Sequence, residues 1–159
     1  MAQSITYTPW GALNTLQNGC YGTGQNVGCT QRQETYTYNN RLQPAMIELG
    51  TTSNNSGNYC LVYNYYSGSN PASCAVPSAG ASDNGNVMGY WYNDNTNSTL
   101  NHTASYAYDT LNRLSTAQAK DLNQNCLWGV SMPTSNGYDR WGNLLNRTVT
   151  CGTATTLSR

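Results

Sequence analysis

The sequence predicts an all-β protein built from stacked antiparallel β-hairpins that form a twisted ribbon or a partial β-shell. A tyrosine-led stretch at 106–114 returns about thirty residues later at 138–144, which indicates a repeated unit. The chain has 13 Tyr, 4 Trp and no Phe, and charged residues make up only 9% of it. Tyrosine favours strands and combines an apolar ring with a polar tip, so this composition suits sheets with many turns and a partly hydrated face.

The two copies of the unit share a tyrosine, an aspartate, a turn residue and a leucine. These are Tyr108 and Tyr138, Asp109 and Asp139, Asn112 and Gly142, and Leu114 and Leu144. Asn and Gly are the residues that adopt positive φ most readily, so the exchange predicts a left-handed residue at this position in both copies. A strand ends in the tyrosine, the aspartate opens the turn through its side chain, and the leucine begins the return strand.

A helix is the alternative for residues 110–120, because apolar side chains recur at three-residue spacing from Leu111 to Ala117. We reject it because the parallel copy carries Gly142 and continues into β-branched residues at 148–150. Both copies are therefore predicted to be hairpins.

The chain is predicted to contain one β domain with two flanking segments. Residues 1–34 are rich in Gly, Asn, Gln and Thr and are expected to form an irregular or capping segment with a short strand at 5–8. Residues 35–151 form the β domain, and 152–159 are a tail.

The first hairpin of this domain is predicted around Tyr36 and Tyr38, which alternate with threonine. Asn39-Asn40 is expected to be a two-residue loop. Arg41 then takes the same position in the unit as Arg113, and each arginine is expected to lie over a neighbouring aromatic ring.

The middle of the domain contains a long interruption. Residues 60–66 form the most strand-like segment, and 67–82 are a low-complexity excursion with two prolines. A return strand is predicted at 86–92, a further strand at 126–130, and the last strand at 143–151.

Six cysteines favour disulfide bonds and an oxidising compartment. Sequential pairing would join Cys20 to Cys29, Cys60 to Cys74, and Cys126 to Cys151, closing three local loops. Free thiols are the alternative. A zinc site is less favoured than either, because the chain has no Cys-x-x-Cys motif and one His. No metal site or cofactor is predicted.

Charge and hydropathy narrow the class of partners. Seven basic and seven acidic residues balance, which does not indicate nucleic acid as a partner. No apolar run approaches the length of a membrane span, and no signal peptide precedes Trp10. We expect a secreted protein at the cell surface or outside it, lacking its leader or cut from a longer chain; a cytosolic protein is the alternative.

The tyrosine-led unit resembles the Rhs/YD-repeat family, whose pattern is roughly Tyr-x-Tyr-Asp-x-x-Gly-Arg/Asn-Leu. The resemblance covers about residues 35–150. It is carried by Tyr106, Tyr108, Asp109, Asn112, Arg113 and Leu114, by Tyr138, Asp139, Gly142 and Leu144, and by a shortened copy with Tyr36, Tyr38 and Arg41.

The resemblance implies a structural, non-enzymatic role. In that family the repeats build a β-strand ribbon that spirals into a hollow shell, which encloses a toxin in bacterial members and carries recognition surfaces in animal adhesion receptors. This chain has no Asp-Pro self-cleavage motif and no toxin module after residue 150. Self-cleavage and toxicity are therefore not expected of it, whereas encapsulation or assembly is.

A carbohydrate-binding or adhesion module is the second hypothesis, with sugars stacking on exposed Tyr and Trp such as Trp91 or Trp141. Catalysis is a third. A Ser-His-Asp triad would use His102, the single histidine, with Asp94 or Asp109. A glycosidase pair would use Asp109 and Asp139, but the repeat explains both as turn residues, so no catalytic residue is predicted.

The repeat also predicts how the chain associates. Each hairpin buries little apolar surface alone and gains stability from its neighbours, which are other repeats of the same or another copy of the chain. About five imperfect units are too few to close a shell, so the end strands expose backbone groups that favour edge-to-edge assembly.

Overall fold

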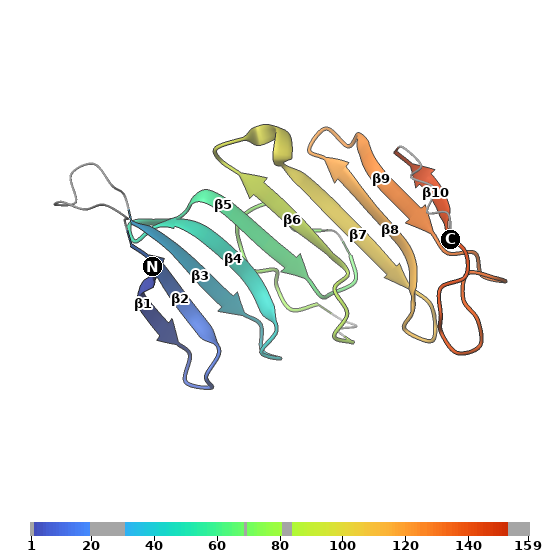
Figure 1. The fold of residues 1–159 in the computed structure, drawn as a ribbon, viewed down its shortest axis with the longest axis horizontal. Coiled ribbons are helices and arrows are strands. Elements are labelled where there is room, and N and C mark those ends of the chain that lie inside the picture. Colours follow the sequence, from blue (N-terminus) through green and yellow to red (C-terminus); the bar gives the residue numbers. More distant parts are fainter. Residues whose placement is uncertain (1, 20–30, 69, 81–83, 153–159) are drawn as a thin grey trace.

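The computed structural model describes residues 2–19, 31–68, 70–80 and 84–152, and it confirms the all-β prediction. Within these described residues, ten antiparallel strands form one sheet in which each strand pairs with its neighbours in the chain, in the order β1 to β10 (Figure 1). The strands are β1 (Ala2–Tyr7), β2 (Leu13–Asn18), β3 (Arg32–Tyr38), β4 (Pro44–Thr51), β5 (Asn54–Asn64), β6 (Gly89–Asp94), β7 (His102–Tyr108), β8 (Leu114–Asp121), β9 (Cys126–Ser131) and β10 (Thr148–Cys151). One 3-10 turn, η1 (Ser98–Leu100), precedes β7.

Five turns in the described residues share one geometry. The side-chain oxygen of the first residue accepts a hydrogen bond from the backbone N–H of the fifth, and the N–H of the first donates to the carbonyl of the fifth. The fourth residue has positive φ, between 62° and 88°. The turns begin at Thr8, Asn39, Asp109, Asp121 and Asp139. The predicted left-handed residues are confirmed, with φ of 65° at Asn112 and 88° at Gly142.

The Asn39 turn corrects the predicted two-residue loop. Asn39 takes the place of the aspartate, Leu42 is the positive-φ residue, and the Asn39 N–H donates to the Gln43 carbonyl at 3.0 Å. The copy is therefore full length. Gln43, and not Arg41, stands where the other copy has Arg113, so the predicted equivalence of the two arginines is wrong.

The N-terminal segment is also more regular than predicted. Residues 2–18 form the hairpin of β1 and β2, which belongs to the same sheet as the rest. The turn of this hairpin does not match the aspartate pattern in the sequence, because its first residue is Thr8. The Thr8 hydroxyl accepts from the Ala12 N–H at 3.0 Å. Gly11 supplies the positive φ. Residues 20–30, which include Cys20 and Cys29, lie outside the described residues.

Tyrosine hydroxyls link each hairpin to the one before it. Four tyrosines at strand ends on one end of the sheet each donate to a carbonyl at the start of the preceding return segment. The bonds run from Tyr38 to Leu13 at 2.7 Å, from Tyr65 to Pro44 at 2.9 Å, from Tyr108 to Val87 at 2.8 Å, and from Tyr138 to Leu114 at 2.7 Å. The recurrence of tyrosine before the turn thus has a structural role, since its ring carries a hydrogen-bond donor to the neighbouring hairpin.

The covering loop, which the structure describes at residues 65–68, 70–80 and 84–88, replaces the compact turn between β5 and β6. Its described part packs on one face of the sheet (Figure 1). Beneath it lies the core, made of Cys60, Val62 and Trp91 with Met46 and Cys74. The predicted disulfide between Cys60 and Cys74 is present and holds the loop to β5. The return strand begins at Gly89, three residues later than predicted, because the loop still contributes Val87 and Met88.

The second described disulfide joins Cys126 to Cys151, as predicted, and fastens β10 to β9. No described cysteine is free. The last strand is shorter than the predicted 143–151. Leu144 forms an isolated bridge with Tyr138, the Leu145 and Asn146 N–H groups donate to the Gly137 carbonyl, and β10 begins only at Thr148.

Candidate functional site: a tyrosine groove on β5, β6 and β7

Alternation along β5 and β6 gives the sheet two different faces. Cys60, Val62 and Trp91 point toward the covering loop, so the residues between them point the other way. On that second face Leu61 pairs with Tyr92, and Tyr63 pairs with Tyr90. These side chains are half-buried, so the aromatic residues of the second face remain accessible to solvent.

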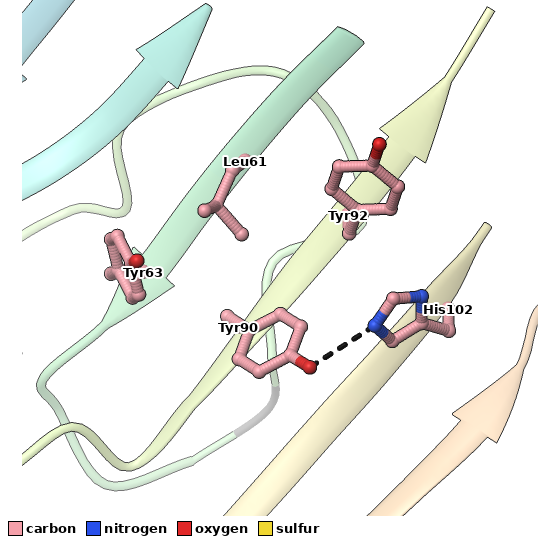
Figure 2. A pocket seen from close by; sticks show the side chains of 5 residues that line it. All are labelled: Leu61, Tyr63, Tyr90, Tyr92 and His102. Atoms are coloured by element: carbon pink, nitrogen blue, oxygen red, sulfur yellow. Dashed lines mark hydrogen bonds between the residues drawn. The ribbon is translucent and has the colours of Figure 1, made fainter. Parts of the chain in front are cut away.

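A groove of about 340 Å³ lies among these side chains. Its lining comes from three adjacent strands, as Figure 2 shows: Leu61 and Tyr63 from β5, Tyr90 and Tyr92 from β6, and His102 from β7. The lining is mainly apolar, and none of the described residues that form it is acidic or is an arginine or lysine. It therefore suits an uncharged ligand with an apolar surface.

The rings of this face contact one another at angles that are mostly tilted or perpendicular. Tyr63 and Tyr90 meet at 6.4 Å between centroids with an interplanar angle of 68°. Tyr90 continues to Tyr106 at 6.3 Å, and Tyr59 meets Tyr92 at 5.9 Å. Such edge-to-face packing stabilises aromatic pairs beyond their burial alone. Three buried alanines lie between the larger side chains of this face: Ala104, Ala117 and Ala119.

His102 forms hydrogen bonds to Leu100 and to Tyr90 of β6. Its Nδ1 lies 2.6 Å from the Leu100 carbonyl. Its Nε2 lies 3.0 Å from the Tyr90 hydroxyl, the contact that is dashed in Figure 2. A carbonyl only accepts, so Nδ1 carries the proton and Nε2 accepts from Tyr90 when the ring is neutral. The histidine is thus a structural hydrogen-bond bridge between a loop and the groove.

Burial makes these phenols weaker acids. The pKa of Tyr106 is raised to about 12 by burial and then by the neighbouring Tyr90. Burial also raises the pKa of Tyr90 above its ordinary value. At the edge of this face the Tyr36 hydroxyl donates to Glu34 at 2.7 Å, and that hydrogen bond is the main reason that the pKa of Tyr36 rises to about 12. In the groove, burial raises the pKa of both Tyr90 and Tyr92 above the ordinary value, so these two phenols are neutral at physiological pH.

The structure separates the two tryptophans that the sequence proposed for ligand stacking. Trp91 is 8% exposed and packs in the core under the covering loop, so it is not available to a ligand. Trp141 is 75% exposed at the tip of the Asp139 turn, with the Arg140 guanidinium 4.5 Å from its ring centroid. The sequence feature that corresponds to the groove is the alternation of large side chains at Tyr59, Leu61, Tyr63, Tyr90 and Tyr92.

Arg113 has the structural role that the sequence predicted. Its guanidinium lies 4.7 Å from the centroid of the Tyr138 ring, and it forms an ion pair with Asp109 at 2.7 Å. It therefore joins the Asp109 turn to the next hairpin. Asp109 and Asp139 each hold a turn, and their pKa values are lowered chiefly by hydrogen bonds, from the Arg113 N–H and from the Asn143 side chain respectively.

The described residues do not bring the catalytic candidates together. A carbonyl, and not a carboxylate, orients His102 at Nδ1. Asp94 instead accepts hydrogen bonds from Thr96 and Asn97 within its own loop. Glu48 lies beside the sulfurs of Cys60 and Cys74, but those sulfurs are bonded to each other and are not thiolate ligands for a metal.

Comparison with known proteins does not place the chain in a family. No family profile matches it, and none of the curated proteins compared with it is significantly similar. The described part of the chain contains no helix that is both long enough and apolar enough to cross a membrane.

Proposed function

We propose that this chain is a structural, non-enzymatic module, a segment of an Rhs/YD-repeat type β-ribbon or shell that mediates encapsulation or assembly. The observation that carries the proposal is the tyrosine link between successive hairpins. Four hydroxyls, from Tyr38, Tyr65, Tyr108 and Tyr138, join each unit to the preceding one at one end of the sheet. A rule of this kind lets a sheet lengthen by whole hairpins.

The same design explains how a sheet with so small a core holds together. The buried apolar cluster of Cys60, Val62 and Trp91 lies on β5 and β6, with Met46 of β4 and Cys74 of the covering loop packed against it. The turn geometry and the hydroxyl links, in contrast, run along the sheet. Each hairpin is supported mainly by its nearest neighbours, which is the property that repeat proteins use to build extended surfaces. Extended surfaces enclose or display other molecules.

The two described disulfides favour an oxidising environment, in keeping with a role outside the cell or at its surface. The Cys60–Cys74 disulfide holds the covering loop to β5, and the Cys126–Cys151 disulfide holds the edge strand β10 to β9. Secretion is part of this proposal.

The scaffold proposal predicts that the chain has no catalytic activity, and a turnover assay tests this prediction. The purified, oxidised protein is incubated with panels of chromogenic glycosides, esters and peptides, and we expect no turnover above buffer. A His102→Ala variant is the matched comparison, because His102 is the residue that a triad would need. Turnover by the wild type that His102→Ala abolishes would overturn the proposal in favour of an enzyme.

Carbohydrate binding is a second candidate, and the tyrosine groove is the observation that favours it. A sugar ring has an apolar face and a rim of hydroxyls. The groove offers aromatic surface from Tyr63, Tyr90 and Tyr92 together with phenol hydroxyls that donate and accept hydrogen bonds. Trp141 offers a second, more exposed ring at a turn.

A glycan array distinguishes binding in the tyrosine groove from binding at Trp141. If the groove binds sugar, Tyr63→Ala and Tyr92→Ala lose the bound glycans while Trp141→Ala retains them, and the reverse pattern assigns the turn. Near-ultraviolet circular dichroism of each variant checks that the remaining aromatic packing is intact. A wild-type chain that retains no glycan on the array removes this candidate.

A further inference from the structure

The hairpins repeat one geometry closely enough to show which groups at the two ends of the sheet lack a counterpart. At four of the described compact turns a tyrosine precedes the turn and faces the residue six positions later across it. The pairs are Tyr7 with Leu13, Tyr38 with Pro44, Tyr108 with Leu114, and Tyr138 with Leu144. In the last pair, the Asp139 N–H donates to Asn143 and the Leu145 N–H donates to Gly137.

These flanking bonds fix the direction of the backbone groups between them. Residues that face each other between two such bonds form a non-hydrogen-bonded pair, whose own N–H and C=O groups point out of the hairpin. The Leu13, Pro44 and Leu114 carbonyls point outward in this way, and each accepts a tyrosine hydroxyl from the following hairpin. The Leu144 carbonyl occupies the equivalent position at the β10 end of the sheet.

The donor that would complete the series is at the opposite edge. Tyr7 precedes the Thr8 turn as the linking tyrosines precede theirs, but it lies on the edge strand β1 and is 62% exposed. Leu144 is 41% exposed. The sheet thus has a donor, the Tyr7 hydroxyl, at its first strand. It has an outward-pointing acceptor, the Leu144 carbonyl, beside its last strand.

The edge strands suit direct pairing with each other. Neither β1 (Ala2–Tyr7) nor β10 (Thr148–Cys151) contains a charged residue or a proline, the features with which proteins usually block sheet edges. Because ten strands alternate in direction, β1 of a second copy lies antiparallel to β10 when it continues the sheet. Its Thr8 turn then falls at the same end as the Asp139 turn.

We propose that copies of this chain associate head to tail, with β1 of one copy pairing with β10 of the next and the Tyr7 hydroxyl donating to the Leu144 carbonyl. The partner is a second copy of the chain, and this inference rests on the scaffold function proposed above. A heterologous contact of this kind does not close on itself and extends into a ribbon.

Two edge-blocked variants test the arrangement by sedimentation velocity. Ile5→Lys places a charge on β1 and leaves β10 able to pair, whereas Val149→Lys does the opposite; both side chains are partly exposed, at 46% and 36%. The wild type is expected to form a concentration-dependent series of oligomers. Each variant alone is expected to remain monomeric, and an equimolar mixture is expected to form dimers and nothing larger.

The hydroxyl link is tested separately. Tyr7→Phe removes one hydrogen bond and is expected to weaken association about fivefold, whereas Tyr106→Phe, which removes a hydroxyl far from both edges, leaves it unchanged. If Ile5→Lys or Val149→Lys alone formed dimers, the contact would be a symmetric one and not the proposed pairing of β1 with β10. A wild type that stays monomeric overturns the interface, and the turnover assay judges the scaffold function independently.

Discussion

The turn at Asp109 and the turn at Asp139 are nearly identical locally and differ in what surrounds them. In both, the aspartate Oδ1 accepts from the N–H groups two and four residues on, at 2.9 Å in the first and 2.8 Å in the second. The first joins β7 to β8, which pair from His102 to Tyr108. The second is flanked by a single bridge between Tyr138 and Leu144.

The difference shows that the turn and the hairpin have separate causes. The turn needs an oxygen-bearing side chain at its first position and a residue that tolerates positive φ at its fourth. Paired strands need more, namely a neighbouring strand along which the backbone hydrogen bonds can continue. β7 has β6 and β8, whereas residues 132–147 lie beyond the end of β9, where Gly137 donates to the Pro133 carbonyl and the chain folds on itself. Stability is therefore concentrated in the centre of the sheet.

The largest expected effect comes from removing one tryptophan in each region. Trp91→Ala opens a cavity in the core beneath the covering loop and is expected to cost about 3–5 kcal/mol of unfolding free energy. Trp141→Ala, at an exposed turn, is expected to stay within about 0.5 kcal/mol. Urea unfolding of both variants measures the contrast. Equal losses would show that the C-terminal turn carries as much stability as the core.

Opening the disulfide at the C-terminal end should separate the regions further. Replacing Cys126 and Cys151 together by serine removes a link across 25 residues and is expected to cost about 3 kcal/mol. Hydrogen exchange should accelerate in β10 and stay slow in β7 and β8, which have no covalent link. The serine pair at Cys60 and Cys74 is the control, and it should loosen the covering loop instead. Uniform acceleration would indicate that the sheet unfolds as one unit.

Exchanging the positive-φ residues compares the two turns directly. Asn112→Gly keeps the backbone geometry but removes the Oδ1 that accepts from Asn84 and Asn86 of the covering loop, both at 2.9 Å, and should cost about 1 kcal/mol. Gly142→Asn adds a side chain where nothing lies within 4 Å of the new Cβ, and should change stability by less than about 0.5 kcal/mol. Thermal unfolding decides the order, and a larger loss for Gly142→Asn contradicts it.

The smallest effects concern the charge of the two aspartates. Both pKa values lie below the ordinary value in the folded chain, so each contributes stability that is present above about pH 4 and is lost as pH falls through the folded pKa. Asp109 also pairs with Arg113, whereas Asp139 contacts the neutral Asn143. In a carboxyl NMR titration, added salt should raise the pKa of Asp109 more than that of Asp139, because salt screens ion pairs. An equal response would assign both shifts to hydrogen bonds alone.

Sequence alone predicted the parts of the fold that depend on a few adjacent residues. It located the Asp109 and Asp139 turns, their positive-φ residues and two of the disulfides, because those features follow from local side-chain chemistry and loop closure. It missed the Thr8 turn and shortened the Asn39 turn. In the Thr8 turn the backbone N–H donates to a side-chain hydroxyl, and in the Asn39 turn it donates to a side-chain amide oxygen. In the Asn39 turn, Leu42 takes the left-handed position that Asn or Gly usually occupies.

The tertiary structure decided the two faces of the sheet, and with them the candidate site. Trp91 and Tyr90 are neighbours in the chain and have similar composition around them, yet one lies in the core and the other in the groove. The covering loop makes that choice, because it packs on one face only and leaves the other to the tyrosines. Which of two alternating faces becomes buried depends on a segment distant in sequence, and no local pattern contains that information.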